Sequence, residues 1–349
     1  MSFLRSSKPG RLTRRTLLGA AAAGAGFASL RPAAAAPPSP VWAVAYSPDG
    51  KLLAAGRYRE VLVWRLGDPG ARPSIVWNEA PGPVRGLAWS PDGTRLAAAT
   101  GRPGQTGEVA VIHGAHQPPL GGEYPVHLYK EHKDVVEGIA FASEGRVLLT
   151  AGLDDRALAL QMEPRKPLAT MGDHTGRVTA IAVSPNGKYV ATGSLDRTVK
   201  IWSAADYLPL ANVDGSVGPV TALVFIPGND QFAVAGEEGN VRLFRVVEQR
   251  SGGQVGVNGA FVRQINGNRT PVNCLAVAAK GTLLAIGGED RVVHLYDSAN
   301  GRRLQQLKDS PEPIYGVALS PDASQVAAGS RDGKVRIWSA ADGKLLHTL

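Results

Sequence analysis

The sequence predicts an all-β fold, a seven-bladed β-propeller of four-stranded antiparallel blades that spans residues 37–349. Three observations predict it. A unit of about 42 residues recurs seven times, and each unit contains four short stretches of strand-forming residues separated by tight turns. The first stretch of every unit also alternates small and large side chains, which is the period of a strand. Four strands in each repeat of this length are typical of a propeller blade.

Length and composition agree with this fold. The chain has 349 residues, of which 44% are hydrophobic and 19% charged, so it can bury a sizeable core without disulfide or metal support. The 42 glycines and 25 prolines are spread along the chain, which favours many short strands joined by tight turns.

The seven units align on their first residue. They begin at Val41, Val84, Val136, Val178, Val220, Val272 and Ile314. Two of the intervals are about ten residues longer than the others, and we expect loop insertions there. The fourth unit shows the plan most clearly, with strands expected at 178–183, 189–193, 198–202 and 207–213. A Pro-Asn-Gly turn follows the first of them, where proline sets φ and glycine accepts positive φ.

The first strand of each unit carries small residues on one face. They occupy one column of the repeat: Ala43, Gly86, Gly138, Ala180, Ala222, Cys274 and Gly316. The opposite face is large and apolar, so we place this strand innermost, where crowded sheets interdigitate around the axis. Cys274 fills a small position, and we interpret it as inert core. Because it is the only cysteine, an internal disulfide, a c-type haem attachment and a cysteine-rich zinc site are excluded.

The N-terminal segment holds most of the excess positive charge. The net charge is +8, but residues 1–36 contain six basic and no acidic residues, which leaves 32 basic against 30 acidic residues in the rest. A nearly neutral body argues against a nucleic-acid partner, because such binding needs clustered lysine and arginine.

The same segment predicts export. Thr13–Leu18 resembles the twin-arginine export motif, in which an arginine pair, here Arg14 and Arg15, precedes apolar residues. Residues 16–30 are too short and too mildly apolar to be a stable membrane anchor, and the small residues Ala33–Ala36 suit cleavage. We expect residues 1–36 to be a cleaved signal peptide and the propeller to be periplasmic or extracellular. The alternative is a disordered basic leader.

The repeats resemble those of the WD-repeat family over about residues 40–349. The fourth unit carries the resemblance most fully, through the following residues: Gly172, Asp173, His174, Ser194, Asp196 and Trp202. The resemblance implies a hydrogen-bonded tetrad that ties strands within a blade, running from Trp202 to Ser194, then to His174 and Asp196. A Ser-His-Asp set also invites a nucleophilic interpretation. We favour the structural role, because the family uses the set in that way.

Two further features bear on the family resemblance. The family usually shares one blade between the two chain ends, whereas here no strand precedes Val41 and residues 344–349 can supply the outermost strand of the seventh unit. We therefore expect blades one and seven to close the ring mainly by side-chain packing. Residues 101–108 and 130–136 are similar to exported bacterial WD-repeat proteins that often occur beside or fused to c-type cytochrome domains. This implies an envelope cytochrome protein as a partner.

Other reactive side chains do not assemble into a site. Four histidines lie in one stretch: His113, His116, His127 and His132. In a blade the first two fall on the face opposite the last, roughly 20 Å away, which is too far for one metal ion. Glu237-Glu238 stands in a turn, where we interpret the pair as solvated rather than catalytic. We predict no catalytic residue, no metal and no cofactor.

These observations favour an exported, non-enzymatic protein-interaction scaffold, because a ring of blades offers a rigid platform with variable loops. The alternative is an envelope enzyme or small-ligand-binding propeller with a site in the central channel.

One variable column predicts where a partner binds. Its members begin the innermost strands and should ring the upper mouth of the channel: Trp42, Arg85, Glu137, Thr179, Thr221, Asn273 and Tyr315. Aromatic residues and arginine are enriched in binding hot spots. The predicted partner surface lies over blades seven, one and two and consists of Trp42, Arg57, Tyr58, Arg59, Arg85, Arg102 and Tyr315. It should prefer a protein with an acidic or aromatic patch. The alternative is an ordinary solvated rim.

Overall fold

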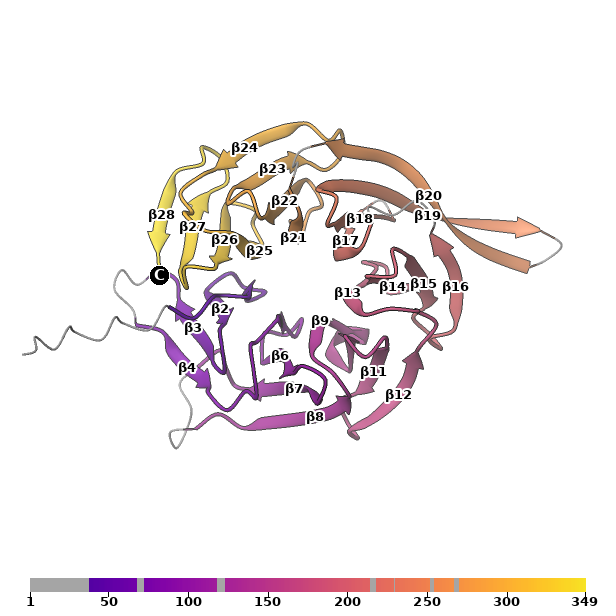
Figure 1. Ribbon diagram of the computed structural model, residues 1–349, viewed down its shortest axis with the longest axis horizontal. Coiled ribbons are helices and arrows are strands. Elements are labelled where there is room, and N and C mark those ends of the chain that lie inside the picture. Colours follow the sequence, from indigo (N-terminus) through magenta and orange to yellow (C-terminus); the bar gives the residue numbers. More distant parts are fainter. Residues whose placement is uncertain are drawn as a thin grey trace, which may run out of the picture. The chain divides into compact units, whose positions relative to one another are not determined.

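Seven four-stranded antiparallel sheets stand around a central channel in the computed structural model, which describes residues 38–67, 72–117, 123–213, 218–228, 230–251, 254–266 and 270–349 (Figure 1). The predicted seven-bladed propeller is confirmed, and it occupies the compact unit Pro38–Leu349. The predicted signal peptide, with Arg14 and Arg15, lies outside the described residues.

Each blade is built from four consecutive strands, the first innermost and the last at the rim. Blade one contains β1 (Ala43–Tyr46), β2 (Leu52–Gly56), β3 (Val61–Arg65) and β4 (Ser74–Trp77); blade two contains β5 (Gly86–Trp89), β6 (Arg95–Arg102), β7 (Thr106–His113) and β8 (Val126–His132). Blade three contains β9 (Val136–Ala142), β10 (Val147–Gly152), β11 (Ala157–Gln161) and β12 (Lys166–Met171); blade four contains β13 (Val178–Val183), β14 (Tyr189–Ser194), β15 (Val199–Ser203) and β16 (Pro209–Val213). Blade five contains β17 (Val220–Ile226), β18 (Gln231–Gly236), β19 (Asn240–Ser251) and β20 (Gln254–Asn266); blade six contains β21 (Val272–Val277), β22 (Leu283–Gly288), β23 (Val293–Asp297) and β24 (Arg303–Leu307). Blade seven contains β25 (Ile314–Leu319), β26 (Gln325–Ser330), β27 (Val335–Ser339) and β28 (Leu345–Thr348).

The turns between first and second strands follow from their sequence. In blade four, Gly187 takes a positive φ of 69°, the Oγ of Ser184 donates to the Oδ1 of Asn186 at 2.7 Å, and that oxygen accepts the Lys188 N–H at 3.0 Å. These bonds satisfy the polar groups of a tight reversal. We call the channel end that carries these turns the bottom face, and the end that carries the turns between second and third strands the top face.

The hydrophobic core of the described residues is divided into seven clusters, and each cluster joins two neighbouring blades. The second strands are buried along their whole length in blades three, four, five and six. A strand with both faces buried needs apolar partners on both sides. The core therefore lies between the blades, and each blade depends on two neighbours.

The ring closes between blades one and seven without a shared blade, as predicted. Val41, Tyr46 and Leu53 pack with Ala327, Val335 and Ile337 of blade seven. The Val41 N–H also donates to the carbonyl of Ser330 at 3.1 Å, and the Tyr46 hydroxyl donates to Gln325 at 3.3 Å. Side-chain packing thus supplies most of the closure, with few hydrogen bonds across the seam.

One long hairpin departs from the regular blade. The strands β19 and β20 have 12 and 13 residues and project beyond the rim of blade five (Figure 1). The insertion expected in the fifth unit is therefore not a loop over its whole length: from Gln254 onward it belongs to β20, which pairs with β19 as far as Ser251 and Gln254. The Oε1 of Glu248 accepts a hydrogen bond of 2.5 Å from the Tyr189 hydroxyl, which ties the hairpin to blade four.

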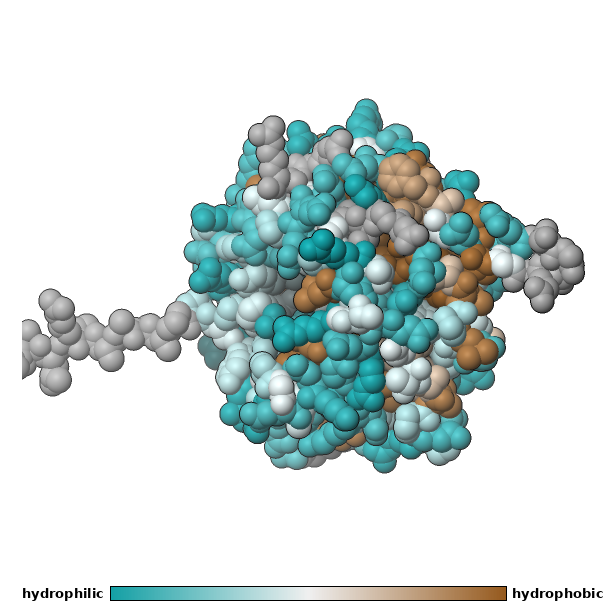
Figure 2. Space-filling model, turned by 45° about the vertical axis from the view of Figure 1, so that its right-hand side comes forward, coloured by the Kyte–Doolittle hydropathy of each residue, from teal (hydrophilic) through white to brown (hydrophobic). Residues whose placement is uncertain are grey.

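The rim strands leave some apolar side chains in solvent. Each of the seven blades has at least one on its outermost strand or on the turn before it: Ile75, Leu128, Leu168, Leu208, Leu210, Phe261, Leu304 and Leu346. On the face shown in Figure 2, apolar surface lies mostly in the half that carries the β19–β20 hairpin. The single helix among the described residues, the 3-10 turn Ser143–Gly145 (η1), is far too short to cross a membrane.

The seam between blades one and seven should be sensitive to a single added methyl group. A Cβ at Gly329 would overlap the side chain of Val41, so Gly329→Ala should lower the free energy of unfolding by about 1–3 kcal/mol. Thermal and denaturant unfolding measure the change. Gly172→Ala is the matched control, since its new Cβ would lie 3.7 Å from the nearest atom. Equal stability of the two variants would show that the seam is not tightly packed.

Candidate functional site

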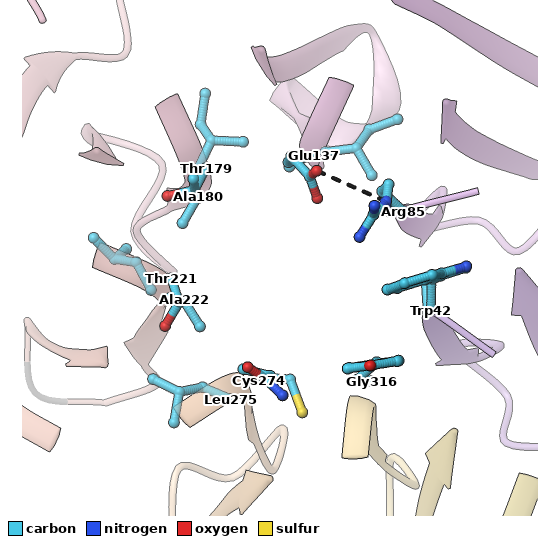
Figure 3. Close-up of a pocket in the computed structure, with 18 of the residues that line it drawn as sticks. Trp42, Arg85, Glu137, Thr179, Ala180, Thr221, Ala222, Cys274, Leu275 and Gly316 are labelled. Carbon is cyan, nitrogen blue, oxygen red and sulfur yellow. Dashed lines mark ion pairs between the residues drawn. The ribbon is translucent and has the colours of Figure 1, made fainter. Parts of the chain in front are cut away.

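A central channel of about 530 Å³ is the candidate site. All seven members of the variable column line it, as the repeat predicted: Trp42, Arg85, Glu137, Thr179, Thr221, Asn273 and Tyr315 (Figure 3). Small residues of the innermost strands, among them Ala180 and Gly316, line it below them. The channel walls therefore come from every blade, one strand from each.

Local backbone geometry explains why this column faces the channel. In blades three to seven, the register between first and second strands shifts at this position, so that one residue of the first strand has no partner opposite. In blade four, for example, Val178 pairs with Ser194 and Ala180 with Gly193, which leaves Thr179 between them. Such a β-bulge re-aims the side chain of the extra residue. In these five blades the bulge thus releases one residue from the packing of the sheet.

In blades four, five and six this residue fastens one blade to the next. The Oγ1 of Thr179 donates to the carbonyl of Val220 at 2.6 Å, and the Oγ1 of Thr221 donates to that of Val272 at 2.5 Å. The Nδ2 of Asn273 donates to the carbonyl of Ile314 at 3.0 Å. Each acceptor begins the next innermost strand. This half of the channel mouth is therefore structural.

The other half forms a continuous stack, which we call the aromatic arc: Tyr315, Trp42, Arg85 and Glu137. The Tyr315 and Trp42 rings are stacked with centroids 4.5 Å apart and planes 9° from parallel. The Cζ of Arg85 lies 3.9 Å from the Trp42 ring centroid. The Nε of Arg85 is 3.8 Å from the Oε1 of Glu137 in the next blade (Figure 3). Stacked arginine and tryptophan attract through the ring quadrupole. The arc spans blades seven, one, two and three.

The sequence missed Glu137 as a member of this set. The predicted surface contained Tyr315, Trp42 and Arg85 but stopped at blade two. Arg85 and Glu137 have opposite charges and occupy the same position of two consecutive repeats. Because consecutive blades are neighbours in the ring, this pattern indicates that the two side chains can pair. Glu137 extends the arc by one blade and gives it a negative end.

Burial in the channel shifts the pKa values of two side chains of the arc, Glu137 and Tyr315. It raises the pKa of the Glu137 carboxyl, although the guanidinium of Arg85 acts in the opposite direction. Burial also raises the pKa of the Tyr315 hydroxyl. The Nε of Arg85 is buried and has no hydrogen-bond partner in the described residues. The arc therefore holds an N–H group and a carboxylate whose hydrogen-bonding capacity is not used by the residues that the structure describes.

The remaining predicted partner residues lie on the top face around blades one and two. Tyr58 is 56% exposed, and Arg59 and Arg102 are exposed as well. Arg57 is different, because its Nη2 donates to the carbonyl of Gly333 at 2.6 Å and its Nη1 lies 3.7 Å from Glu60. It joins blade one to blade seven, so part of its guanidinium is engaged in ring closure.

The tetrad of blade four is present with one corrected member. The Nε1 of Trp202 donates to the Oγ1 of Thr192 at 2.9 Å, and Thr192 also bonds the Nε2 of His174 at 2.8 Å. The Nδ1 of His174 is 2.9 Å from the Oδ2 of Asp196. The hydroxyl in this chain is therefore that of Thr192 and not the predicted Ser194.

Cross-strand register explains the correction. Thr192 pairs with Lys200, and the residue opposite Trp202 is Val190, so Thr192 is the diagonal neighbour that the indole can reach. Ser194 lies two residues further along, at the turn, where its Oγ donates to the carbonyl of Gly176 at 2.9 Å and accepts the Asp196 N–H at 3.0 Å.

The charges of the tetrad support a structural role. Burial lowers the pKa of His174 by more than Asp196 raises it, so the ring is neutral at neutral pH. Burial by itself would raise the pKa of Asp196, but hydrogen bonds from Thr198 and His174 outweigh it and lower the pKa to about 2. The His174 side chain has no exposed surface, and the Thr192 hydroxyl is buried between Trp202 and His174. No nucleophile of this set reaches solvent.

Blade three keeps the same chain without the tryptophan. His132 bonds Asp154 and the Oγ1 of Thr150, both at 2.8 Å. His113 and His127 are paired elsewhere, with Nε2 and Nδ1 3.1 Å apart. No group of three or more potential metal-ligating residues occurs in the part of the chain that the structure describes.

The seven blades and the tetrad define a propeller assembled from short sequence repeats. A family model described as "WD domain, G-beta repeat" matches residues 35–65, 73–104, 123–158, 165–203 and 301–339. The chain belongs to the WD40-repeat family. A second model, the WD40 domain of anaphase-promoting complex subunit 4, matches residues 223–317. No curated protein matches the chain.

The corrected tetrad leads to a direct test on Thr192. Thr192→Val keeps the shape of the side chain but removes the hydroxyl. This leaves the Trp202 N–H and the Nε2 of His174 without partners, at about 1–3 kcal/mol of unfolding free energy. Thr192→Ser keeps the hydroxyl and serves as the matched control, with a smaller loss. Denaturant unfolding measures both. If the valine variant is as stable as the serine variant, the hydroxyl does not hold the blade together.

Proposed function

We propose that this chain is an exported, non-enzymatic scaffold that binds a protein partner on its top face, over blades seven, one, two and three. Membership of the WD40-repeat family supports an interaction scaffold, and the aromatic arc is the observation that supports this location. Tryptophan, tyrosine and arginine are the residues most enriched in binding hot spots. The arc presents all three side by side.

The contrast between the two halves of the channel mouth supports a binding role for the arc. In blades four to six the bulged residue makes a hydrogen bond that holds the next blade. Within the described residues, none of the four arc side chains makes such a bond. Packing alone does not account for an arginine and a glutamate in a confined channel, because burying charge is costly unless it is fully paired. A partner that bonds the Arg85 Nε and the Glu137 carboxylate would satisfy both.

Strained backbone on the same face gives a second line of support. Arg59 has φ 69° and Arg291 has φ 68°, at the turn position where blades five and seven have Gly239 and Gly333. A left-handed residue that is not glycine costs roughly 1–2 kcal/mol. Both arginines are exposed. Asp155 and Arg197 have left-handed backbone at the same position, with φ 66° and 72°. Three of these four residues are arginines and one is acidic, which on balance favours an acidic partner.

The second candidate function uses the same channel for a small molecule. A channel of about 530 Å³ is in the size range of small-ligand sites, and aromatic and charged side chains line half of its mouth. A bound small molecule or substrate turnover by the purified propeller would favour this alternative. A c-type cytochrome protein of the cell envelope is the first partner to test for the scaffold, on the resemblance to exported bacterial repeat proteins.

The partner surface is tested by capture of partners from the native envelope followed by titration of the captured protein. Trp42→Ala should weaken binding by more than about 1 kcal/mol, because it removes the centre of the stack. Arg59→Gly should also weaken binding while relaxing its turn, so its melting temperature should not fall. Arg302→Ala, an exposed charge on the bottom face, is the control. Normal binding by both top-face variants, with loss in the control, would place the partner on the opposite face.

Export is tested on the arginine pair. Changing both Arg14 and Arg15 to lysine preserves the charge but removes the guanidinium pair that the twin-arginine route is proposed to recognise. The full-length precursor should then accumulate in the cytoplasm, as measured by fractionation and immunoblotting. Changing Arg5 and Lys8 together is the control for general loss of basic residues. A double variant that is still exported and shortened at the normal rate would exclude this route.

A further inference from the structure

A second cavity, of about 900 Å³, opens on the bottom face between blades three and four, away from the aromatic arc. Its walls come from η1, the ends of β10 and β11, the strand β12 and the turn between β15 and β16. We call it the lower pocket and define it by five of its lining residues: Arg95, Arg146, Met162, Leu168 and Tyr207. Nothing in the tetrad or in ring closure requires a cavity here.

Tyr207 is held in this pocket by strained backbone. The residues Trp202–Asp206 of blade four and Trp338–Asp342 of blade seven have the same sequence. Both turns also close with the same pair of backbone hydrogen bonds. The donors are the N–H groups of Tyr207 and Ser203 in blade four and those of Gly343 and Ser339 in blade seven. The next residue is Tyr207 with φ 61° in blade four and Gly343 with φ 73° in blade seven. Left-handed backbone is routine for glycine and unfavourable for tyrosine. Glycine therefore suits this turn, as in blade seven, whereas blade four has a tyrosine at the same position.

Strained non-glycine residues cluster at functional sites, where the surrounding structure holds them in place. The half-buried Tyr207 packs against the core of blades three and four and also lines the pocket. Burial raises the pKa of its hydroxyl, which makes no hydrogen bond within the described residues. Two further lining residues have a positive φ, Ser143 with 48° and Gly145 with 83°, so two of the three left-handed residues in the wall are not glycine.

Two guanidinium groups give the pocket its charge. The Nη2 of Arg95 lies against Gly145, 2.8 Å from where a Cβ would stand, so it sits beside the backbone that carries Arg146. Among the described residues Arg95 has one carboxylate neighbour, Asp92 at 3.9 Å, and Arg146 has none. The Nε of Arg146 donates to the carbonyl of Ser143 at 3.2 Å. Both groups therefore keep N–H donors available for an anion.

Two acidic residues, Glu163 and Asp206, also line the wall. They lie on other elements than the guanidinium groups: Arg95 and Arg146 lie together beside η1, whereas Asp206 lies in the β15–β16 turn, where its Oδ1 accepts the Leu208 N–H at 3.3 Å. Glu163 also lines the neighbouring cavity at His113 and His127. The apolar part of the wall is uncovered, since Leu168 is 41% exposed. The wall thus combines a pair of guanidinium groups beside η1 with exposed apolar surface.

We propose that the lower pocket binds a small organic anion, whose carboxylate, sulfonate or phosphate group contacts Arg95 and Arg146 and whose apolar or aromatic body packs on Tyr207, Met162 and Leu168. Guanidinium groups recognise such heads through charge-assisted hydrogen bonds. The accessible part of the Tyr207 ring and the exposed Leu168 side chain offer apolar surface on which an aromatic body can pack. The site is independent of the partner surface on the top face.

The experiment uses the mature propeller and two fluorescent probes with the same rings. Anilinonaphthalene sulfonate carries an anionic head, and phenylnaphthylamine is its neutral counterpart. The charged probe should bind one saturable site, and the neutral probe should bind at least about tenfold more weakly, because only the former pairs with the guanidinium groups. Titrations are run at a temperature at which every variant has the circular dichroism spectrum of the wild type.

Three variants decide the assignment. Arg146→Ala removes an exposed cation without disturbing the core. It should lower the affinity for the charged probe by about tenfold. Tyr207→Gly installs the residue of blade seven and should weaken both probes. Arg302→Ala, in the equivalent turn of blade six, should bind as the wild type does. The proposal is overturned if the wild type shows no saturable binding, if Arg146→Ala or Tyr207→Gly binds normally, or if the neutral probe binds as tightly as the charged one.

Discussion

Burial of apolar surface between neighbouring blades is the constraint on which the rest of this structure depends. The second strand of blades three to six is buried on both faces, and every core cluster of the described residues joins two blades. A four-stranded blade alone would leave one of those faces in water, so the layers stabilise each other around the ring. The last layer, between Val41 of blade one and Ile337 of blade seven, completes the circle without a shared strand.

The same packing explains how the channel mouth became free to vary. The core requires a buried valine or isoleucine at the start of each innermost strand and a small residue two positions later. The bulge leaves the residue between them outside the ladder. That position can therefore hold a threonine that bonds the next blade or a tyrosine that stacks on its neighbour, with little change in the fold. The bulge holds structural residues in blades four to six and presents Glu137 and Tyr315 in blades three and seven. In blades one and two, Trp42 and Arg85 lie just before the innermost strands β1 and β5 instead.

Comparison of equivalent turns in different blades shows where the backbone is strained. Where Gly333 meets the need for a left-handed turn on the top face, blade one has Arg59, and where Gly343 meets it on the bottom face, blade four has Tyr207. In both comparisons the less strained residue is present in the same chain. In the top-face turn the same exchange occurs at Asp155, Arg197 and Arg291, whereas Tyr207 differs from glycine in the bottom-face turn that lines the lower pocket.

The order of residues by itself determined the fold, because the period, the alternation of small and large side chains and the turn residues are all local patterns. It also determined which residues ring the channel, since equivalent positions of a closed ring are equidistant from its axis. Tertiary structure decided the rest. Thr192 and not Ser194 meets Trp202 because cross-strand register selects the diagonal neighbour. Glu137 joins the arc, and Arg57 is engaged by Gly333, through contacts between blades. Those contacts depend on distances between residues far apart in sequence, which no local pattern encodes.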